Sequence, residues 1–179
     1  MRRIALFAVL CGCASAGTPS TDETTPRQAT IYAGSDAPLL LAEKPRAVVA
    51  SLAAAPATVW LATKKVYQEF DIPLTVENPA THQIGNQNFY KTREFAGQPM
   101  VQFVDCGSGM TGPKASSYRI YMSLLTMVQS DGKGGTTIQT TFVPTGQDLS
   151  GNSSDRLPCG TTGRAEALLI DRVKAVLGK

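Results

Sequence analysis

The sequence has almost no histidine and no long hydrophobic run. The only histidine among the 179 residues is His82, in a polar loop at residues 79–83, so we expect neither a catalytic triad nor a zinc site built on it. No segment reaches the roughly 18 apolar residues that a transmembrane helix needs. We therefore expect any attachment of this chain to a membrane to be covalent.

The sequence also has little excess charge. The formal net charge is +3, and without Arg2 and Arg3 the 17 basic residues become 15 against 14 acidic ones. Proteins that bind nucleic acid cluster lysine and arginine to neutralise several phosphates. Here the bases are scattered, with Lys64 and Lys65 as a neighbouring pair. We expect no nucleic-acid partner.

Residues 1–13 have the pattern of a bacterial export signal. A positively charged start, Met1-Arg2-Arg3, leads into the short apolar stretch Ile4 to Leu10. The run Leu10-Cys11-Gly12-Cys13 resembles the lipobox of bacterial lipoproteins. That resemblance implies fatty acids such as palmitate on Cys13, and an outer-membrane lipoprotein facing the periplasm.

The following residues offer a competing cleavage site. Ordinary signal peptidase cuts after sequences such as Ala14-Ser15-Ala16, and cleavage after Ala16 would release a soluble periplasmic or secreted protein. Residues 14–29 contain no large apolar side chain, so we expect a flexible tether there, with order beginning between about 30 and 45. Such a spacer favours the lipid-anchored alternative.

Two further cysteines, Cys106 and Cys159, would then lie in an oxidising compartment. An even pair in such a compartment is more often bridged than free, so we expect a disulfide, with two free thiols as the alternative. A bridge across about 50 residues stabilises a fold by roughly 4 kcal/mol on the chain-entropy model. A metal site has less support, because no C-x-x-C motif occurs.

Residues 46–179 predict a single domain that begins with a strand and a helix. The β-branched Val48 and Val49 favour a strand over Arg46 to Leu52. A helix then opens at Pro56 and ends before Pro73. Its apolar stripe recurs at steps of three and four residues: Val59, Ala62, Val66 and Phe70, widened by Trp60 and Tyr67.

The middle of the chain predicts strands and the end predicts a helix. We expect strands at 74–77, 88–95 and 100–105, with Gly85 among the separating residues, and then a hairpin that joins 118–129 to 136–143. One hairpin face carries Tyr118, Ile120, Met122, Leu124 and Val128, opposed by Ile138 and Phe142. The other is less polar than usual because it carries Tyr121, Leu125 and Met127.

Residues 144–160 read as a polar loop, and Gly163 starts a final helix. The apolar stripe of this helix is Ala165, Leu168, Leu169, Val173, Val176 and Leu177. The element order predicts an α+β fold, an antiparallel sheet of about five or six strands with an N-terminal and a C-terminal helix packed on one face.

Few of the remaining residues suggest chemistry. Residues 107–114 depart from the phosphate-binding P-loop pattern, because Pro113 stands where lysine follows the second glycine. Four acids, Glu77, Asp105, Asp148 and Asp155, show no spacing that marks a metal site or an acid–base pair. Trp60 is expected in the core rather than against a ligand. We therefore predict no enzyme and no cofactor.

The entry to the first helix, Ala54-Ala55-Pro56-Ala57-Thr58-Val59-Trp60, resembles two known patterns. One is the helix-grip fold of START-like domains, and the other is BamC, a lipoprotein of the β-barrel assembly machinery. Both imply a strand, a helix, a strand meander and a closing helix over residues 46–177. The START-like resemblance also implies a small apolar ligand held between the last helix and the sheet.

The sequence thus predicts a non-enzymatic envelope lipoprotein that acts as a binding or assembly accessory. Its partners would be the membrane, through the lipid, and an envelope protein. The alternatives are a periplasmic carrier of a small apolar ligand in a helix-grip cavity and a hydrolase without a recognisable motif.

The anchor is directly testable at Cys13. If this cysteine carries the lipid, Cys13→Ser expressed in the native host will move the protein from the membrane fraction to the soluble fraction and abolish labelling by a radioactive fatty acid. Cys11→Ser is the matched control and should keep both properties. A wild-type protein without label and with unchanged fractionation would instead establish cleavage after Ala16.

Overall fold

The computed structural model describes residues 30–32, 38–40, 47–150 and 154–178. Strands β1 (Thr30–Tyr32) and β2 (Pro38–Leu40) pair antiparallel with each other. The predicted signal peptide, the tether and Cys13 lie outside the described residues.

An antiparallel sheet of six strands forms the centre of the domain. The strand order is β13-β12-β11-β5-β4. Strand β3 pairs with the first part of β12, on the same side of β12 as β13, which pairs with its last part. The strands are β3 (Val48–Leu52), β4 (Val76–Asn78), β5 (Gln83–Thr92), β11 (Arg119–Ser130), β12 (Thr136–Gln147) and β13 (Leu157–Pro158).

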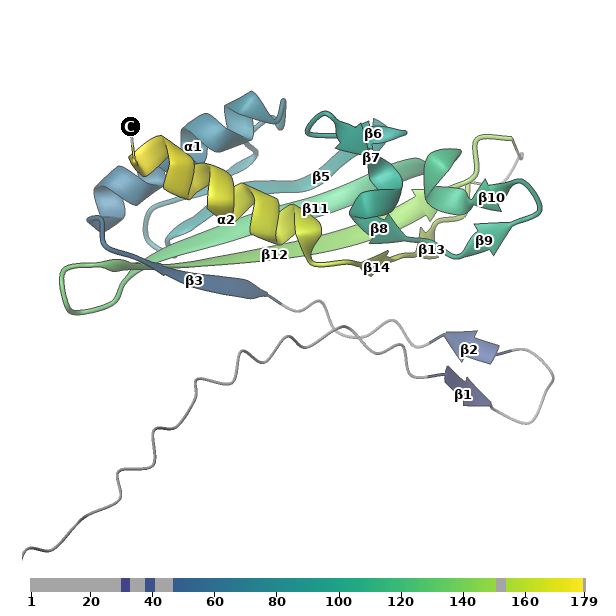
Figure 1. Ribbon diagram of the computed structural model, residues 1–179, viewed down its shortest axis with the longest axis horizontal. Coiled ribbons are helices and arrows are strands. Elements are labelled where there is room, and N and C mark those ends of the chain that lie inside the picture. Colours follow the sequence, from purple (N-terminus) through teal and green to yellow (C-terminus); the bar gives the residue numbers. More distant parts are fainter. Residues whose placement is uncertain (1–29, 33–37, 41–46, 151–153, 179) are drawn as a thin grey trace, which may run out of the picture.

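Two helices, α1 (Pro56–Glu69) and α2 (Arg164–Leu177), lie together on one face of this sheet (Figure 1). Proline stands in the first turn of α1, where its missing N–H has no helical partner to lose. Both helices turn their predicted apolar stripes to the sheet, and Trp60 packs against the core from a partly buried position. The predicted α+β class, with both helices on one face, is confirmed.

The segment between β5 and β11 folds over one end of the sheet, where η denotes a 3-10 helix. Its short elements are β6 (Glu94–Phe95), β7 (Gln98–Pro99), η1 (Met100–Gln102), β8 (Val104–Asp105), β9 (Ser108–Gly109), β10 (Gly112–Pro113) and η2 (Lys114–Ser116). After β13, strand β14 (Gly160–Thr161) pairs with β8.

The prediction of a strand over 100–105 is wrong for most of that segment. Residues 100–102 form η1. A 3-10 turn brings side chains three residues apart to the same side, so both can enter the core. Met100 and Phe103, spaced in that way, are exposed by 0% and 1%. Only Val104 and Asp105 at its end are extended.

The predicted strand bounds around Gly85 are also wrong. Strand β5 begins at Gln83 and runs through Gly85, because this glycine lies where two neighbours come very close. A Cβ atom added at Gly85 would collide with the carbonyl oxygen of Leu124 and approach the Tyr67 hydroxyl to 2.9 Å. A glycine inside a strand here marks close approach rather than an end of the strand.

The predicted polar loop over 144–160 is corrected as well. Strand β12 continues through Pro144 to Gln147, and β13 and β14 follow within the same segment. The Pro144 carbonyl accepts a hydrogen bond from the Cys159 N–H at 3.3 Å, on the side of β12 away from β11. Since N–H and C=O of one strand residue point to the same side, proline at this position removes no bond to β11.

The core lies between the helices and the sheet. Phe95 is 1% exposed, and its ring centroid lies 5.3 Å from that of Phe103 and 5.9 Å from that of Phe70. Near α1, the buried Tyr67 hydroxyl lies 3.0 Å from Thr126 Oγ1, which lies 3.1 Å from Thr140 Oγ1. This chain of hydroxyls satisfies polar groups that would otherwise be buried without partners.

The first turn of α2 buries one carboxyl group. Glu166 is 0% exposed, and the Thr161 hydroxyl lies 3.1 Å from each of its oxygens. Burial raises the pKa of Glu166 above its usual value of 4.5, because the charged form loses its hydration. The neutral carboxyl group is therefore favoured more in the folded chain than in the unfolded chain.

This raised pKa predicts a pH-dependent stability. The protonated Glu166 carboxyl group makes its full contribution to the free energy of unfolding below about pH 4.5. This contribution is lost as the pH rises through the folded-state pKa, because the Glu166 carboxyl group loses its proton at a lower pH in the unfolded chain than in the folded chain. Between about pH 4 and pH 7, urea unfolding should show the wild type losing stability relative to Glu166→Gln. Glu94→Gln, at an exposed position, is the control for loss of one carboxylate. Parallel stability curves for the wild type and Glu166→Gln would contradict the assignment.

Candidate functional site

The face of the sheet opposite α1 and α2 is the candidate functional site. We call it the outer face and define it by the strand side chains that alternate away from the helices. They are Val49 and Ser51 of β3, Gln83, Tyr90 and Thr92 of β5, Arg119, Tyr121, Ser123, Leu125, Met127 and Gln129 of β11, and Thr137, Gln139, Thr141, Val143, Thr145 and Gln147 of β12.

The outer face carries exposed hydrophobic side chains. Val49, Tyr90 and Val143 expose 57%, 56% and 39% of their surfaces, and Leu125 and Met127 between them are partly buried. Within residues 47–178 both described α-helices lie on the opposite side (Figure 1). Scattered apolar residues on a surface are ordinary, but a face that gathers them together indicates contact with another molecule.

Two tyrosines and two arginines form a row at one end of the outer face. The ring centroids of Tyr90 and Tyr121 lie 5.8 Å apart. The Arg119 guanidinium lies 5.0 Å from the centroid of Tyr90, and that of Arg156 lies 3.4 Å from the centroid of Tyr121. Each cation thus stacks on an aromatic ring, which attracts it through the ring quadrupole. We call these four residues the Tyr–Arg row.

Pairing between strands builds this row from three elements. Tyr121 is directly opposite Tyr90 in the register of β11 with β5. Arg156 immediately precedes β13, whose Leu157 is opposite Gly146 of β12. The Tyr121 hydroxyl donates to Gln147 Oε1 at 3.0 Å, which holds the ring in the middle of the row.

The row carries two positive charges, those of Arg119 and Arg156. A hydrogen bond with Tyr121 raises the pKa of Arg119, and the same contact lowers the pKa of the Tyr121 hydroxyl, with smaller contributions from the charge of Arg156. The Nε of Arg119 is buried and has no hydrogen-bond partner among the described residues.

Acidic side chains are missing from the outer face as defined here. Its strand residues include no Asp, Glu or Lys. Four ion pairs lie elsewhere: Lys64–Glu77, Lys91–Asp71, Arg172–Glu69 and Lys174–Asp171. The positive end of the outer face is therefore complementary to an anionic group.

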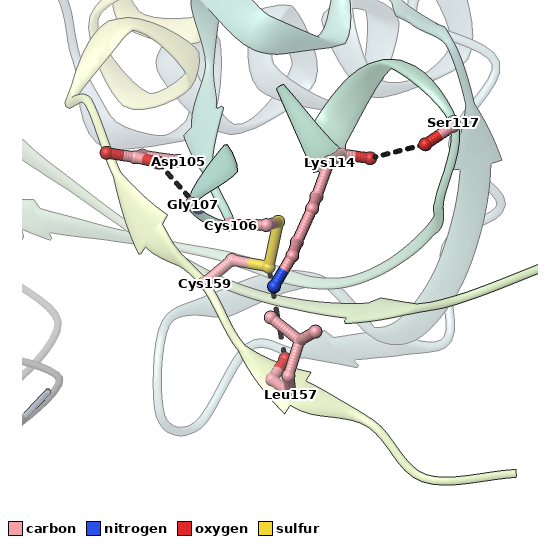
Figure 2. The surroundings of a disulfide bond; sticks show 7 residues. All are labelled: Asp105, Cys106, Gly107, Lys114, Ser117, Leu157 and Cys159. Carbon is pink, nitrogen blue, oxygen red and sulfur yellow. Dashed lines mark hydrogen bonds between the residues drawn. A yellow bond between two sulfur atoms is a disulfide. The ribbon is translucent and has the colours of Figure 1, made fainter. Parts of the chain in front are cut away.

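The predicted disulfide between Cys106 and Cys159 is present. The two sulfurs are 2.06 Å apart and the two Cα atoms 4.4 Å apart. Figure 2 shows the bridge joining the loop after Asp105 to the segment that leads into α2. Asp105 Oδ1 accepts a hydrogen bond from the Gly107 N–H at 2.8 Å and shapes that loop. The prediction that Cys159 attaches the start of the final helix to this loop is confirmed.

Gly146 of β12 has no side chain at the place where the two sulfurs of the disulfide pack against the strand. A Cβ atom at this position would lie 3.1 Å from Cys159 Sγ and 3.3 Å from Cys106 Sγ. The bridge is also buried, since the two cysteines are exposed by 6% and 7%. The disulfide therefore packs as part of the core, where the segment between β5 and β11 meets β12.

The other residues that the sequence singled out do not converge. His82 is exposed, with a backbone φ of 55°, at the start of β5. Residues 107–114 form the β9–β10 hairpin and the start of η2. The described residues contain no group of three His, Cys, Asp or Glu side chains that could hold a metal ion. In this same part of the chain no helix is long and apolar enough to cross a membrane.

Two shallow grooves lie where α1 ends. One, of about 610 Å³, is lined by Gln68 and by residues 71–73 and 88–91, and the other, of about 330 Å³, includes Glu69, Lys91 and Glu94. They differ in place from the cavity between α2 and the sheet that the START-like resemblance implies. The carrier hypothesis stays a prediction.

Sequence reasoning missed most of the Tyr–Arg row. It placed Tyr121 on the correct face but singled out neither Tyr90 nor either arginine. The alternation along β11 was a usable signal for Arg119, which stands two residues before Tyr121. Tyr90 comes from β5 and Arg156 from the residue just before β13, and no local pattern reveals how these segments pair with the hairpin.

The chain matches no protein-family model, and no curated protein matches it. The resemblance of residues 54–60 to START-like and BamC-like domains therefore stays a prediction.

The disulfide predicts a measurable contribution to stability. Reduction should lower the free energy of unfolding by about 2–4 kcal/mol, because the unfolded chain gains the freedom of a loop of roughly 50 residues, while the core keeps the domain folded. Urea unfolding of the full chain with and without reductant measures the difference. The double variant Cys106→Ala/Cys159→Ala is the control, and its curve should not respond to reductant. A wild-type midpoint that is unchanged by reduction would contradict this contribution.

Proposed function

We propose that this protein is a non-enzymatic binding or assembly accessory of the bacterial cell envelope, held at the outer membrane by a lipid on Cys13. The observation that carries the binding role is the outer face, where exposed apolar side chains and the Tyr–Arg row lie together on one side of the sheet. Tyr, Met and Arg are enriched in protein interfaces, whereas Lys, Glu and Asp are depleted there. The outer face has this composition.

The envelope location is supported by two independent features. Residues 1–13 have the pattern of a lipoprotein signal, and the disulfide between Cys106 and Cys159 is of the kind that persists in oxidising compartments. A lipid anchor and a polar spacer would hold the domain near the membrane and leave the outer face accessible to an envelope protein.

A binding role predicts that the protein is found in a larger assembly and that a charge on the outer face disrupts it. Val143→Glu places a carboxylate among the exposed apolar residues of this face, so the assembled fraction should fall by at least about tenfold. Native gel electrophoresis of the detergent-solubilised full chain from its host measures this fraction.

Leu61→Glu is the matched control, because Leu61 is exposed by 66% on α1, on the opposite side of the domain. Both substitutions are at exposed positions and should change the free energy of unfolding by no more than about 0.5 kcal/mol. A protein that migrates alone in the wild type, or an assembly that both variants leave intact, would count against the proposed function.

A further inference from the structure

The Tyr–Arg row carries an inference about the chemistry of the partner. We propose that it is a docking site for an acidic segment of a protein partner, whose Asp or Glu carboxylate is bound by Arg119 and Arg156 beside the two tyrosine rings. This inference rests on the proposed binding function and adds the partner's chemistry to it.

Stacking prepares the two guanidinium groups for a carboxylate. A planar guanidinium that lies over a ring keeps its N–H groups at the edge, where they can donate two parallel hydrogen bonds to a carboxylate. Because Tyr90 and Tyr121 already hold both cations, less side-chain freedom is lost on binding.

Charge complementarity argues against a second copy of this chain as the occupant. The strand residues of the outer face supply Arg119 and no carboxylate, and Arg156 adds a second cation beside them, so two copies packed face to face would bring arginines together. An acidic segment from a different protein supplies the missing charge.

The composition also favours a protein over an anionic membrane surface or a nucleic acid. Such polyanions attract clusters of roughly four to eight Lys or Arg, whereas the Tyr–Arg row has two arginines and the outer face around it carries Thr, Gln and apolar residues. Its seventeen strand side chains approach the roughly 20–30 residues per partner of a standard protein interface. Leu125, Met127 and Val143 would contact apolar residues that flank the partner's acid.

Site-specific photo-crosslinking in the host tests this. The full chain carries a photoreactive amino acid in place of Ser123, between Tyr121 and Leu125 on the outer face, or in place of the exposed Ala175 on α2 as a control position. The crosslinked peptide is mapped by mass spectrometry. The expected result is an adduct from position 123 to a protein segment that contains Asp or Glu.

Charge reversal then assigns the contact. Arg156→Glu should lower the adduct yield by at least about tenfold, and changing the mapped partner acid to Lys should restore it. Arg164→Glu, an exposed reversal at the start of α2, should change the yield by less than about twofold. Arg119→Glu should lower the adduct yield as Arg156→Glu does. If the partly buried Arg119 proves necessary for folding, the exposed Arg156 still allows the contact to be tested.

Several outcomes would overturn the inference. They are an adduct to lipid, glycan or nucleic acid, an adduct within the same chain, a mapped segment without carboxylates, and a yield that Arg156→Glu leaves unchanged. Adducts from position 175 alone would also overturn it, while the proposed binding function would stand. If neither position gives an adduct, both the inference and the proposed function fail.

Discussion

Strand β11 is the constraint on which the rest of the domain depends, because it is paired with β12 on one side and β5 on the other along nearly its whole length. Two neighbours fix its register, and a slip by one residue would exchange its two faces. Ile120, Met122 and Leu124 are thereby assigned to the core, and Arg119, Tyr121 and Leu125 to the outer face. The position of the Tyr–Arg row is thus a consequence of the same pairing that buries the core.

This arrangement separates stability from binding. The helices, the aromatic group around Phe95 and the disulfide all stabilise the helix side of the sheet. The outer face contributes few of those contacts, so its residues are free to serve recognition. The disulfide acts at the point where the chain returns from β13 to α2, and it joins the last helix to the end of the sheet that the segment between β5 and β11 covers.

Local patterns predicted the parts of this fold that local physics determines. The alternation in the β11–β12 hairpin and the apolar stripes of α1 and α2 were readable because each repeats over many residues. Residues 100–102 and Gly85 were misread, since their conformations depend on burial of Phe103 and on contact with Leu124 and Tyr67. Local patterns could not bring the Tyr–Arg row together. The position of Tyr90 depends on the register of β5 with β11, which shifts between Met122 and Leu124. Arg156 is placed by the pairing of β13, which follows it, with the end of β12.

The proline within β12 has a consequence for neighbouring molecules. Strand β3 pairs with β12 up to Thr140, and the pairing of β13 with β12 begins at Thr145, so residues 141–144 of β12 have no strand partner on that side. Unpaired strand backbone invites edge-to-edge addition of a foreign strand and hence aggregation. Pro144 stands in this unpaired stretch with no N–H to offer, and its carbonyl is already bonded to Cys159. An intruding strand therefore finds no complete hydrogen-bond ladder there, so this edge of the sheet is protected against edge-to-edge association of neighbouring molecules.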